Sequence, residues 1–578
     1  MTAGKGFKID RFLFNSTINK ALSEYWYAQE LWPIVYLLKE TISSKKRAYI
    51  GETTDPLNRF YQHISHPEKK LLSEAYLITS NKFNKSATRN LESNLIKYLS
   101  GDASYELLNV NLGLDNHNYF QKDEVYAPIF RSVWDQLRKR GITQHTLASI
   151  DNSDLFKYSP YKTLSPDQTE ILLVVLHSLL DIKYRNVFIE GGAGTGKSVL
   201  AVFLFKLLNT PKEDFSYVDF GASDKEIFSL ISKLKEKYPS PKMALIIPMT
   251  SFRKTVKTIF SHVQGLKPNM VIGPADLVRQ HYDIVLVDES HRLRQRVNLG
   301  SYVDFDKVTA RLGLNNMLHS ELDWVIKQSD KTILFYDEDQ SIKPSDTAKE
   351  AFDRLKDQPQ TQTKFLNSQF RVRGGIKYVN FIRQLLSATV PKDREKVSFK
   401  GYDFFLFPDL QELIKQIKEK NQQYKLARVV AGYAWPWVSR KNSKAFDIQI
   451  QALQLKWNSV NRDWINSANA INEIGCIHTT QGYDLNYTGI IFGPEIGYDK
   501  QKQEIIIHKE NYHDRNGKNN IKKPEQLKNY ILHIYKTLML RGIRGTYLFV
   551  CDEGLREYFA QYIPSIEDAA PRNVHSQK

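Results

Sequence analysis

The sequence is poor in cysteine and has no long hydrophobic run. Cys476 and Cys551 are the only cysteines in 578 residues, so at most one disulfide could join parts of a large chain. The richest apolar stretch, 171–180, is interrupted by His177 and Ser178 and is shorter than the roughly 18 apolar residues of a membrane-spanning helix. The N-terminal residues also lack the apolar core of a signal peptide. These absences favour a cytoplasmic protein in a reducing compartment.

Acidic residues are fewer than basic ones, and the imbalance is uneven along the chain. Lys and Arg number 81 and Asp and Glu 64, which gives a net charge of +17. Residues 1–130 contain 16 basic and 14 acidic side chains, whereas 496–545 contain 11 and 5. This excess favours a polyanion such as nucleic acid as partner, although a merely solvated basic surface accounts for it equally well.

The first part of the chain has the pattern of a small α+β domain. Apolar segments predict strands at 33–39 and 47–53, and helical patterns follow after Asp55-Pro56 and over 88–99. A charged segment, 131–161, separates this part from the rest and is interpreted as a connector. The first domain is therefore placed at residues 1–130.

Beyond the connector, short apolar segments alternate with helical patterns, as in α/β domains with a parallel sheet and crossover helices. Two such domains are expected, at 162–360 and 361–578, with a polar surface insertion or mobile hairpin at about 498–528. The expected strands are 186–192, 243–249, 283–290 and 332–339 in the first, and 365–368, 404–407, 427–434, 474–480, 489–493 and 545–551 in the second.

A glycine-rich loop stands between an apolar strand and an apolar helix. The segment GGAGTGKS fits the pattern G-x-x-x-x-G-K-[ST] of phosphate-binding loops. Its backbone N–H groups would bind phosphate oxygens at the helix N-terminus, with the lysine on the β- and γ-phosphates and the serine hydroxyl on Mg²⁺. The predicted nucleotide-binding residues of the loop are Gly191, Gly192, Ala193, Gly194, Thr195, Gly196, Lys197 and Ser198.

An acidic pair ends another apolar strand of the same expected sheet. Asp288 and Glu289 follow the segment DIVLV. In a parallel sheet this strand end adjoins the phosphate loop, so Asp288 is predicted to hold Mg²⁺ together with Ser198, and Glu289 to activate the attacking water.

The motifs around these residues resemble those of superfamily 1 helicases, in order. Gln168 in LSPDQ matches the glutamine that reads adenine, and it also suits a helix N-cap. IPMT at 247–250 resembles the strand-end motif that touches single-stranded nucleic acid, and Gln340 in YDEDQSI resembles the γ-phosphate sensor.

The later helicase motifs fall in the second α/β domain. Arg371 in NSQFR and Arg541 in LRGIR correspond to the two arginines that reach the γ-phosphate. Gln481 and Gly482 in HTTQGYD correspond to a nucleotide-contacting motif. Residues of about 160–560 look most like the helicase domain shared by group III Schlafen proteins and bacterial relatives, which implies two RecA-like domains, ATP and Mg²⁺.

The first domain is similar to GIY-YIG nucleases over about residues 30–125. The motif residues are Tyr36, Tyr49, Arg59, His63 and Glu92, with Asn109 or Asn111 as the later asparagine. Arg59 and His63 are four residues apart and would share a helical face. The resemblance implies a phosphodiester endonuclease in which Glu92 holds Mg²⁺ or Mn²⁺. Tyr36 is the candidate general base, with a role for His63 also open.

Together these patterns predict an ATP-dependent nucleic-acid translocase or helicase coupled to a metal-dependent endonuclease. DNA is favoured over RNA as substrate, and the fusion resembles anti-phage or restriction-type systems. The alternative is a nucleotide-switched sensor, in which the N-terminal domain binds nucleic acid without cutting and ATP controls assembly with a partner. An oligomer or a defence-system partner is open in either case.

Overall fold

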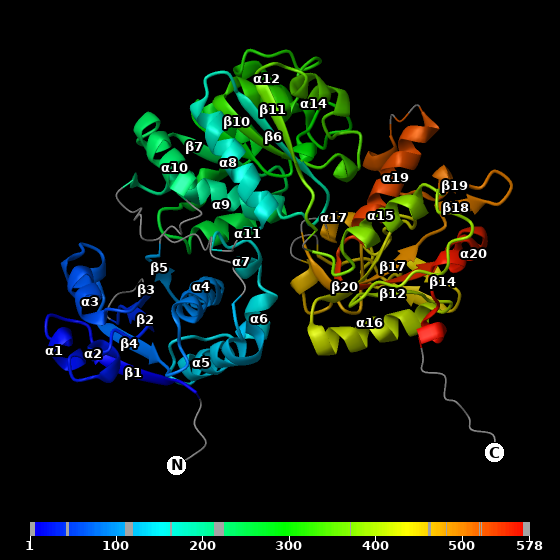
Figure 1. The fold of residues 1–578 in the computed structure, drawn as a ribbon. Helices are drawn as coiled ribbons and strands as arrows, with labels where there is room; N and C mark the ends of the chain where they lie inside the picture. Colours follow the sequence, from blue (N-terminus) through cyan, green and yellow to red (C-terminus); the bar gives the residue numbers. More distant parts are fainter. Residues whose placement is uncertain are drawn as a thin grey trace, which may run out of the picture.

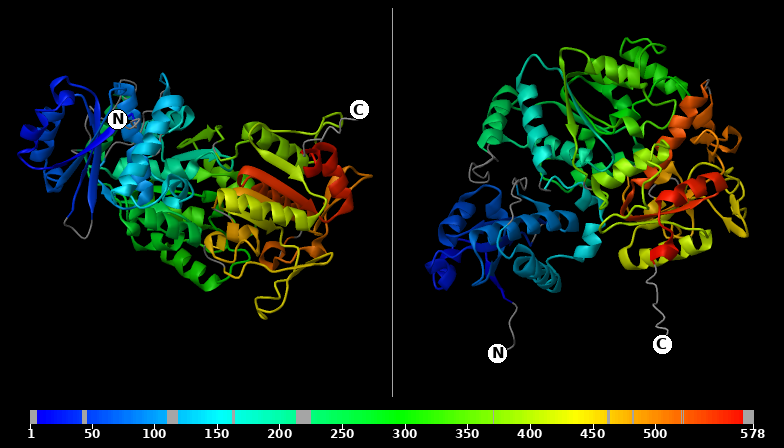
Figure 2. Two further views of the ribbon diagram at one scale, coloured as in Figure 1. Left: turned by 90° about the horizontal axis from the view of Figure 1, so that it is seen from below. Right: turned by 45° about the vertical axis from the view of Figure 1, so that its right-hand side comes forward.

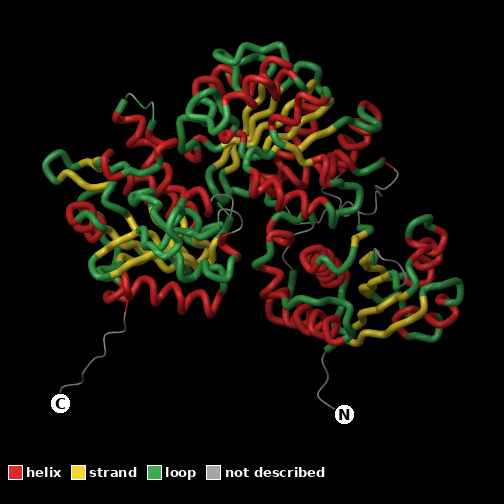
Figure 3. The backbone as a smooth tube through the Cα atoms, turned by 180° about the vertical axis from the view of Figure 1, so that it is seen from behind, coloured by secondary structure: helices red, strands yellow, loops and turns green. Residues whose placement is uncertain are grey.

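Three units, each built on its own β-sheet, follow one another along the chain. The structure is a computed structural model, and it describes residues 6–41, 46–109, 119–161, 164–212, 225–369, 371–460, 464–480, 483–519, 521 and 523–569. The three units appear in blue, in green and in yellow to red in Figure 1, and their separate sheets stand out as yellow strands in Figure 3. Within the described residues no helix has the length and apolarity needed to span a bilayer.

The first sheet is mixed, with the strand order β1-β4-β2-β3-β5. All neighbouring strands are antiparallel except β3 and β5. The strands are β1 (Lys8–Leu13), β2 (Ile34–Lys39), β3 (Arg47–Thr53), β4 (Glu74–Thr79) and β5 (Glu106–Leu107). The strands predicted at 33–39 and 47–53 are confirmed as β2 and β3, whereas β1, β4 and β5 were not predicted.

Helices cover both faces of this sheet because successive strand residues point to opposite sides. Tyr36 and Leu38 pack beside α1 (Ile18–Leu22), α2 (Trp26–Gln29) and α3 (Pro56–Ser65). Val35 and Leu37 point the other way and pack against α4 (Lys85–Asp102). The helix expected over 88–99 is thus longer at both ends. Its N-terminus is fixed by Asn84, whose side chain accepts a hydrogen bond from the backbone N–H of Ala87.

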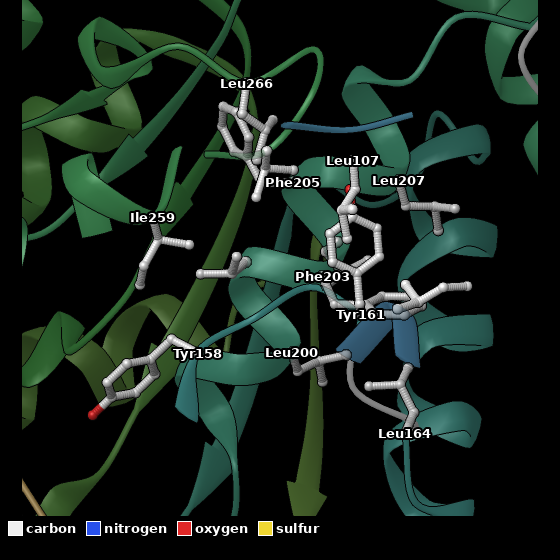
Figure 4. Packing of buried hydrophobic residues seen from close by; sticks show 14 of the residues in the cluster. Leu107, Tyr158, Tyr161, Leu164, Leu200, Phe203, Phe205, Leu207, Ile259 and Leu266 are labelled. Atoms are coloured by element: carbon white, nitrogen blue, oxygen red, sulfur yellow. The ribbon is translucent and has the colours of Figure 1, made fainter. Parts of the chain in front are cut away.

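The segment interpreted as a connector, 131–161, is mostly helical and packed rather than extended. It contains most of α5 (Ala127–Lys139), together with α6 (Leu147–Asp151) and α7 (Asp154–Lys157), and both short helices pack on α4. One hydrophobic cluster continues from the first sheet through this segment into the next unit. Figure 4 shows Leu107, Tyr158 and Tyr161 within it, beside Leu200 and Phe203. The N-terminal unit therefore shares a core with its neighbour.

The second sheet has six parallel strands in the order β11-β6-β10-β9-β7-β8. They are β6 (Asn186–Gly191), β7 (Met243–Ile246), β8 (Val271–Ile272), β9 (Tyr282–Val287), β10 (Ser329–Tyr336) and β11 (Thr361–Leu366). Its helices are α8 (Pro166–Leu180), α9 (Lys197–Asn209), α10 (Lys225–Lys237), α11 (Thr250–Phe260), α12 (Tyr302–Arg311), α13 (Glu321–Lys327) and α14 (Lys349–Lys356). The parallel sheet confirms the expected α/β fold.

Strand β11 corrects the expected division between the two α/β units. The strand predicted at 365–368 was assigned to the second unit, but β11 pairs in parallel with β6 of the first. Its sequence, TQTKFL, is mostly polar and partly exposed because it forms the edge of the sheet. The apolar pattern that marks central strands is therefore missing here.

The third sheet is also parallel, in the order β12-β20-β17-β13-β16. Its strands are β12 (Asp403–Leu406), β13 (Ala427–Ala431), β16 (Ile474–Gly475), β17 (Leu485–Phe492) and β20 (Gly542–Val550). The surrounding helices are α15 (Gly375–Leu386), α16 (Leu410–Tyr424), α17 (Ile477–Thr480), α19 (Pro524–Met539) and α20 (Glu553–Tyr562). This second α/β unit lies beside the first α/β unit, which contains the six-stranded sheet, in both views of Figure 2.

Two local predictions for this unit change in detail. The strand expected over 474–480 is short, and α17 follows it because the Thr480 hydroxyl donates to the Cys476 carbonyl, at 3.0 Å. The expected hairpin near 498–528 is present as β18 (Ile496–Asp499) and β19 (Glu504–Ile507), followed by the helical turn α18 (Arg515–Lys518). A further hairpin joins β14 (Ile448–Ile450) and β15 (Leu453–Leu455).

Candidate active sites

The glycine-rich loop joins the end of β6 to the start of α9. Gly194 and Gly196 both have φ of +84°, a left-handed conformation that only glycine adopts at low cost. The Thr195 hydroxyl donates to the Gly192 carbonyl at 3.0 Å and holds the turn closed. The loop thereby presents its backbone at the N-terminus of α9, as phosphate binding requires.

Lys197 is buried at the first position of α9 and points back across the loop. Its Nζ donates to the carbonyl of Gly192 at 2.9 Å and lies 3.2 Å from Asp337 Oδ2. Asp337 directly follows β10, which is the neighbour of β6 in the sheet. Asp337 belongs to the motif YDEDQSI but is not among the predicted site residues. Its position at a strand end beside the phosphate loop was the available signal.

Asp288 and Glu289 lie at the end of β9, next to β10. Asp288 is buried, and the side chain of Glu289 is 13% exposed. Burial and the neighbouring Glu289 raise the pKa of Asp288 above its ordinary value, although the Ser198 hydroxyl hydrogen-bonds to it. Burial opposes ionisation of Glu289 as well, but His291 and Lys197 outweigh it and lower the pKa of Glu289.

Glu289 also has an unusual backbone. Its φ of +54° places a non-glycine residue in the left-handed region, which is costly and is found most often at functional sites. The carboxylate lies 3.0 Å from Nε2 of His291, a fully buried side chain on the turn η8 (Ser290–Arg292). His291 was not predicted as a site residue, and it orients the carboxylate expected to activate water.

Gln168 lines the same site from the start of α8. Its amide oxygen accepts from the Ser165 N–H, so the helix-capping interpretation holds. Its amide nitrogen lies 3.4 Å from the carbonyls of both Thr195 and Gly196. The glutamine therefore ties the helix start to the phosphate loop.

The second α/β unit contributes both predicted arginines to this site. Arg541 is buried, and its guanidinium donates to the side-chain oxygen of Gln340 at 3.3 Å. Gln340 in turn donates to Asp337 at 2.6 Å. A chain of polar contacts thus runs from Lys197 through Asp337 and Gln340 to Arg541 across the two units. Burial and the nearby Arg371 lower the pKa of Arg541 to about 10.

Arg371 lies next to Arg541 and forms an ion pair with Asp484, at 2.5 Å. Glu289 and Asp337 are within electrostatic range of its guanidinium. Gln369, two residues before Arg371, donates to the Ala193 carbonyl at 2.7 Å and so contacts the phosphate loop directly. Gln481 and Gly482, predicted to contact nucleotide, lie outside the described residues.

The side chains at this site suit a nucleotide with Mg²⁺. Ser198 and Asp288 are already in hydrogen-bonding contact, and a divalent ion shared by them would offset the cost of the two adjacent buried carboxylates. Lys197 and the two arginines supply the positive charge that a triphosphate requires.

The N-terminal site gathers four of its predicted residues on one face of the first sheet. The hydroxyl of Tyr36 on β2 lies 2.7 Å from Nε2 of His63 on α3. Arg59, one turn earlier on α3, donates from Nε to the Tyr36 hydroxyl at 3.3 Å and from a terminal nitrogen to the Tyr49 hydroxyl at 3.5 Å. Lys69 places its ammonium 3.8 Å from the centre of the Tyr49 ring.

Burial decides the protonation states in this cluster. It raises the pKa of Tyr36 well above its ordinary value, and Tyr49 and Glu92 act in the same direction. Burial also lowers the pKa of His63 to about 2, with Lys69 and Arg59 contributing. At neutral pH the cluster therefore contains a neutral phenol next to a neutral imidazole.

Gly51 and Asn109 fix the position of the tyrosines. A Cβ at Gly51 would lie 2.2 Å from the Tyr36 hydroxyl, so the ring can cross the neighbouring strand only where glycine stands. The Asn109 side-chain amide donates to the Ile50 carbonyl at 2.7 Å, and its oxygen accepts from the Ile50 N–H at 3.0 Å. These two bonds hold the backbone of β3 next to Tyr49. Of the two predicted asparagines, Asn111 lies outside the described residues.

Glu92 reaches this cluster from α4. It lies within electrostatic range of the Tyr36 phenol. Among the described residues no group of three or more histidine, cysteine, aspartate or glutamate side chains forms a metal site. An ion bound by Glu92 alone would keep several of its waters, an arrangement that Mg²⁺ accepts.

One comparison with known proteins falls on the two α/β units. The sequence model of a family described as Schlafen group 3, DNA/RNA helicase domain, matches residues 184–552. The uncharacterized protein YPL245W of Saccharomyces cerevisiae is 28% identical over 404 residues, which cover 65% of this chain and 84% of the yeast protein.

Solved structures give weaker similarity. A Pif1 helicase from Bacteroides in complex with ADP-AlF3 and ssDNA has 11% identity and a TM-score of 0.26, covering 70% of this chain and 95% of its own. The E. coli DExH-box NTPase HrpB has 11% identity and a TM-score of 0.23, covering 68% of this chain and 42% of its own. Scores this low support no conclusion about the present chain.

Proposed function

The chain belongs to the Schlafen group 3 DNA/RNA helicase domain family, and from this premise we propose an ATP-driven nucleic-acid translocase coupled to a divalent-metal-dependent endonuclease. The observation that carries the motor is the chain of contacts from Lys197 to Arg541. An arginine of one unit that reaches the nucleotide site of another makes the fit between units depend on the bound nucleotide.

In the ATPase site, each residue has a separate task. The loop 191–198 binds the phosphates and Lys197 neutralises the β- and γ-phosphates. Ser198 and Asp288 would hold Mg²⁺, which would screen phosphate charge. Glu289, oriented by His291, accepts a proton from the attacking water. Arg371 and Arg541 stabilise the charge that develops on the transferred phosphoryl group.

In the nuclease site, the neutral pair of Tyr36 and His63 directs proton transfer. Because burial raises the pKa of Tyr36, the phenol alone is a poor base at neutral pH. His63 is also neutral and lies 2.7 Å from the hydroxyl, so it accepts a hydrogen bond from the phenol and orients the Tyr36 oxygen toward the attacking water. Arg59 supplies positive charge for the scissile phosphate, and Glu92 with Mg²⁺ or Mn²⁺ would neutralise the leaving oxygen.

The substrate is proposed to be DNA. The excess of basic residues in the later part of the chain suits a phosphate backbone. Because motor and nuclease occupy one chain, the motor can bring nucleic acid to the nuclease site at high local concentration. We assign the protein to anti-phage defence, by analogy with other fusions of motor and nuclease domains.

Two single variants of the full chain test both activities at once. Glu92→Ala should lose Mg²⁺-dependent nicking of plasmid DNA and keep ATP hydrolysis, whereas Lys197→Ala should lose hydrolysis and keep basal nicking without ATP. Glu30→Ala, which removes an exposed carboxylate of the same unit, is the control for Glu92. The assay is agarose-gel nicking alongside phosphate release.

The outcomes separate the proposed activities. Nicking that persists in Glu92→Ala would contradict the nuclease assignment and favour the nucleotide-switched sensor. ATP hydrolysis that persists in Lys197→Ala would contradict the assignment of the motor instead.

A further inference from the structure

A cavity of about 730 Å³ lies beside the phosphate loop, between the first α/β unit and the N-terminal unit. Its inner wall contains Gln168, Gly196 and Val199 of the first α/β unit. Its outer wall comes from the N-terminal unit and the helices after it, among them Lys97 and Tyr98 of α4. The volume falls in the range of about 300–1,000 Å³ that is usual for small-molecule pockets.

The location of this cavity follows from the phosphate loop. Gly196 ends the loop and Val199 lies on the first turn of α9, so the cavity opens at the point where bound phosphates would end. A nucleoside attached to those phosphates has to extend away from the loop. The cavity provides the space for its ribose and base.

The outer wall has the chemistry of a base site. The rings of Tyr98 and Phe156 pack on each other in a tilted arrangement, with their centres 4.6 Å apart and their planes at 40°, and the Tyr98 hydroxyl donates to Asp151 at 2.8 Å. The Lys97 ammonium lies 5.1 Å from the centre of the Phe156 ring and has no hydrogen-bond or ion-pair partner among the described residues. Aromatic faces accept planar bases, and a half-buried ammonium without such a partner suits a nucleotide nitrogen or oxygen.

Helix α4 contacts the cavity and the nuclease site with opposite faces. Asn90, Asn94 and Tyr98 are spaced by four residues and line the cavity. Thr88 and Glu92, shifted by two positions, lie on the other side of the helix, toward the sheet. A shift or tightening of α4 on one side therefore moves Glu92 on the other.

We propose that the N-terminal unit completes the base pocket of the bound purine nucleotide, and that α4 transmits the occupancy of this pocket to the nuclease site. The proposal rests on the proposed ATPase function and adds a regulatory contact to it. Nucleotide state then acts on the nuclease directly through a shared helix, in addition to any movement of nucleic acid.

The first test compares the binding of ATP with that of inorganic tripolyphosphate, both with Mg²⁺, to the full-length protein by calorimetry. Lys97→Met should weaken ATP binding about tenfold, or about 1.4 kcal/mol, and leave tripolyphosphate binding within twofold. Asn94→Trp, which fills the cavity, should also weaken ATP binding and leave tripolyphosphate binding unchanged, because the indole occupies the space of the base. Lys139→Met, an exposed lysine on α5 that does not line the cavity, should bind both ligands normally.

The second test measures backbone amide hydrogen exchange over 85–102. ATP should slow exchange in the wild type, tripolyphosphate should leave it unchanged, and Lys97→Met should abolish the ATP effect. The proposal would be overturned if ATP and tripolyphosphate slowed exchange in α4 equally. It would also be overturned if Lys97→Met and Asn94→Trp each weakened the binding of ATP and of tripolyphosphate to the same extent. A different result would contradict the ATPase assignment itself: Lys197→Ala would then bind ATP as tightly as the wild type does.

Discussion

The phosphate site takes its side chains from two parallel sheets, whereas the N-terminal site takes Tyr36, Arg59 and His63 from one sheet and the helix packed on it. Arg541 meets Gln340 across 201 positions of sequence, while Tyr36 meets His63 across 27. The first arrangement exists only when the two α/β units are together. The second is held within one hydrophobic core.

This difference separates what each site can do. A site divided between units can open and close with its ligand, so its chemistry can be converted into movement. A site held by one core has little freedom, and its reactivity is set by burial and hydrogen bonds, as the pKa shifts of Tyr36 and His63 illustrate. Variants that break one site should therefore leave the basal chemistry of the other intact and change only its response to nucleotide.

The largest effect is expected from Arg541→Ala. Loss of the guanidinium removes charge stabilisation from the transition state and the contact with Gln340, so ATP turnover should fall about 10³-fold. ATP binding should change much less, because the loop and Lys197 stay in place. Steady-state phosphate release and equilibrium binding measure the two quantities. Arg544→Ala, three residues later on β20, is the matched control and should turn over normally.

A smaller loss of turnover is expected from Glu289→Gln. The amide keeps the size of the side chain but cannot accept a proton, so hydrolysis should fall about 10²-fold while ATP remains bound. Glu338→Gln, which alters an exposed ion pair with Lys349, serves as control. If Glu289→Gln failed to bind ATP, the residue would have a structural role.

The N-terminal site should respond to packing instead. Gly51→Ala places a Cβ 2.2 Å from the Tyr36 hydroxyl, which should destabilise that unit by up to about 3 kcal/mol and abolish nicking. Thermal unfolding and plasmid nicking provide the measurements. Gly300→Ala is the control, because its Cβ would meet no atom within 4 Å. A normal melting temperature for Gly51→Ala would contradict the close approach of Tyr36.

The smallest effect concerns pH. His63 has a pKa of about 2 in the fold, below its ordinary value near 6.5, so the unfolded chain binds the extra proton as pH falls through 6.5. From pH 6.5 to 5 the wild type should lose about 2 kcal/mol relative to His63→Gln. Melting temperatures of both proteins across this range measure the loss. A constant difference between them would mean that the imidazole is accessible to protons.

Some of this structure was predictable because the signals are local. The phosphate loop requires glycines at fixed spacing between a strand and a helix, and the structure has the left-handed backbone at Gly194 and Gly196. The pair of Arg59 and His63 follows from helical periodicity once α3 is placed. The strands β6, β9 and β10 are central and apolar, so their sequences mark them clearly.

Other features left no comparable signal. Strand β11 is a polar edge strand, so only its pairing with β6 assigns it to the first parallel sheet. The residue types of Asp337 and His291 do not reveal their roles. Asp337 acquires its role from Lys197, which follows the neighbouring strand β6, and His291 from Glu289 in the same turn. The segment 131–161 has the composition of a linker, although its apolar residues join a core shared with the first sheet.

The sequence by itself determined the local chemistry of this protein: a phosphate loop, an acidic pair after a strand, and a tyrosine, arginine and histidine set in the first domain. These depend on spacing within single elements. Only the tertiary structure decided which distant residues meet, including Gln340 with Arg541 and the α4 wall of the cavity. The physical reason is that packing between elements is set by the fit of whole surfaces, which no short stretch of sequence contains.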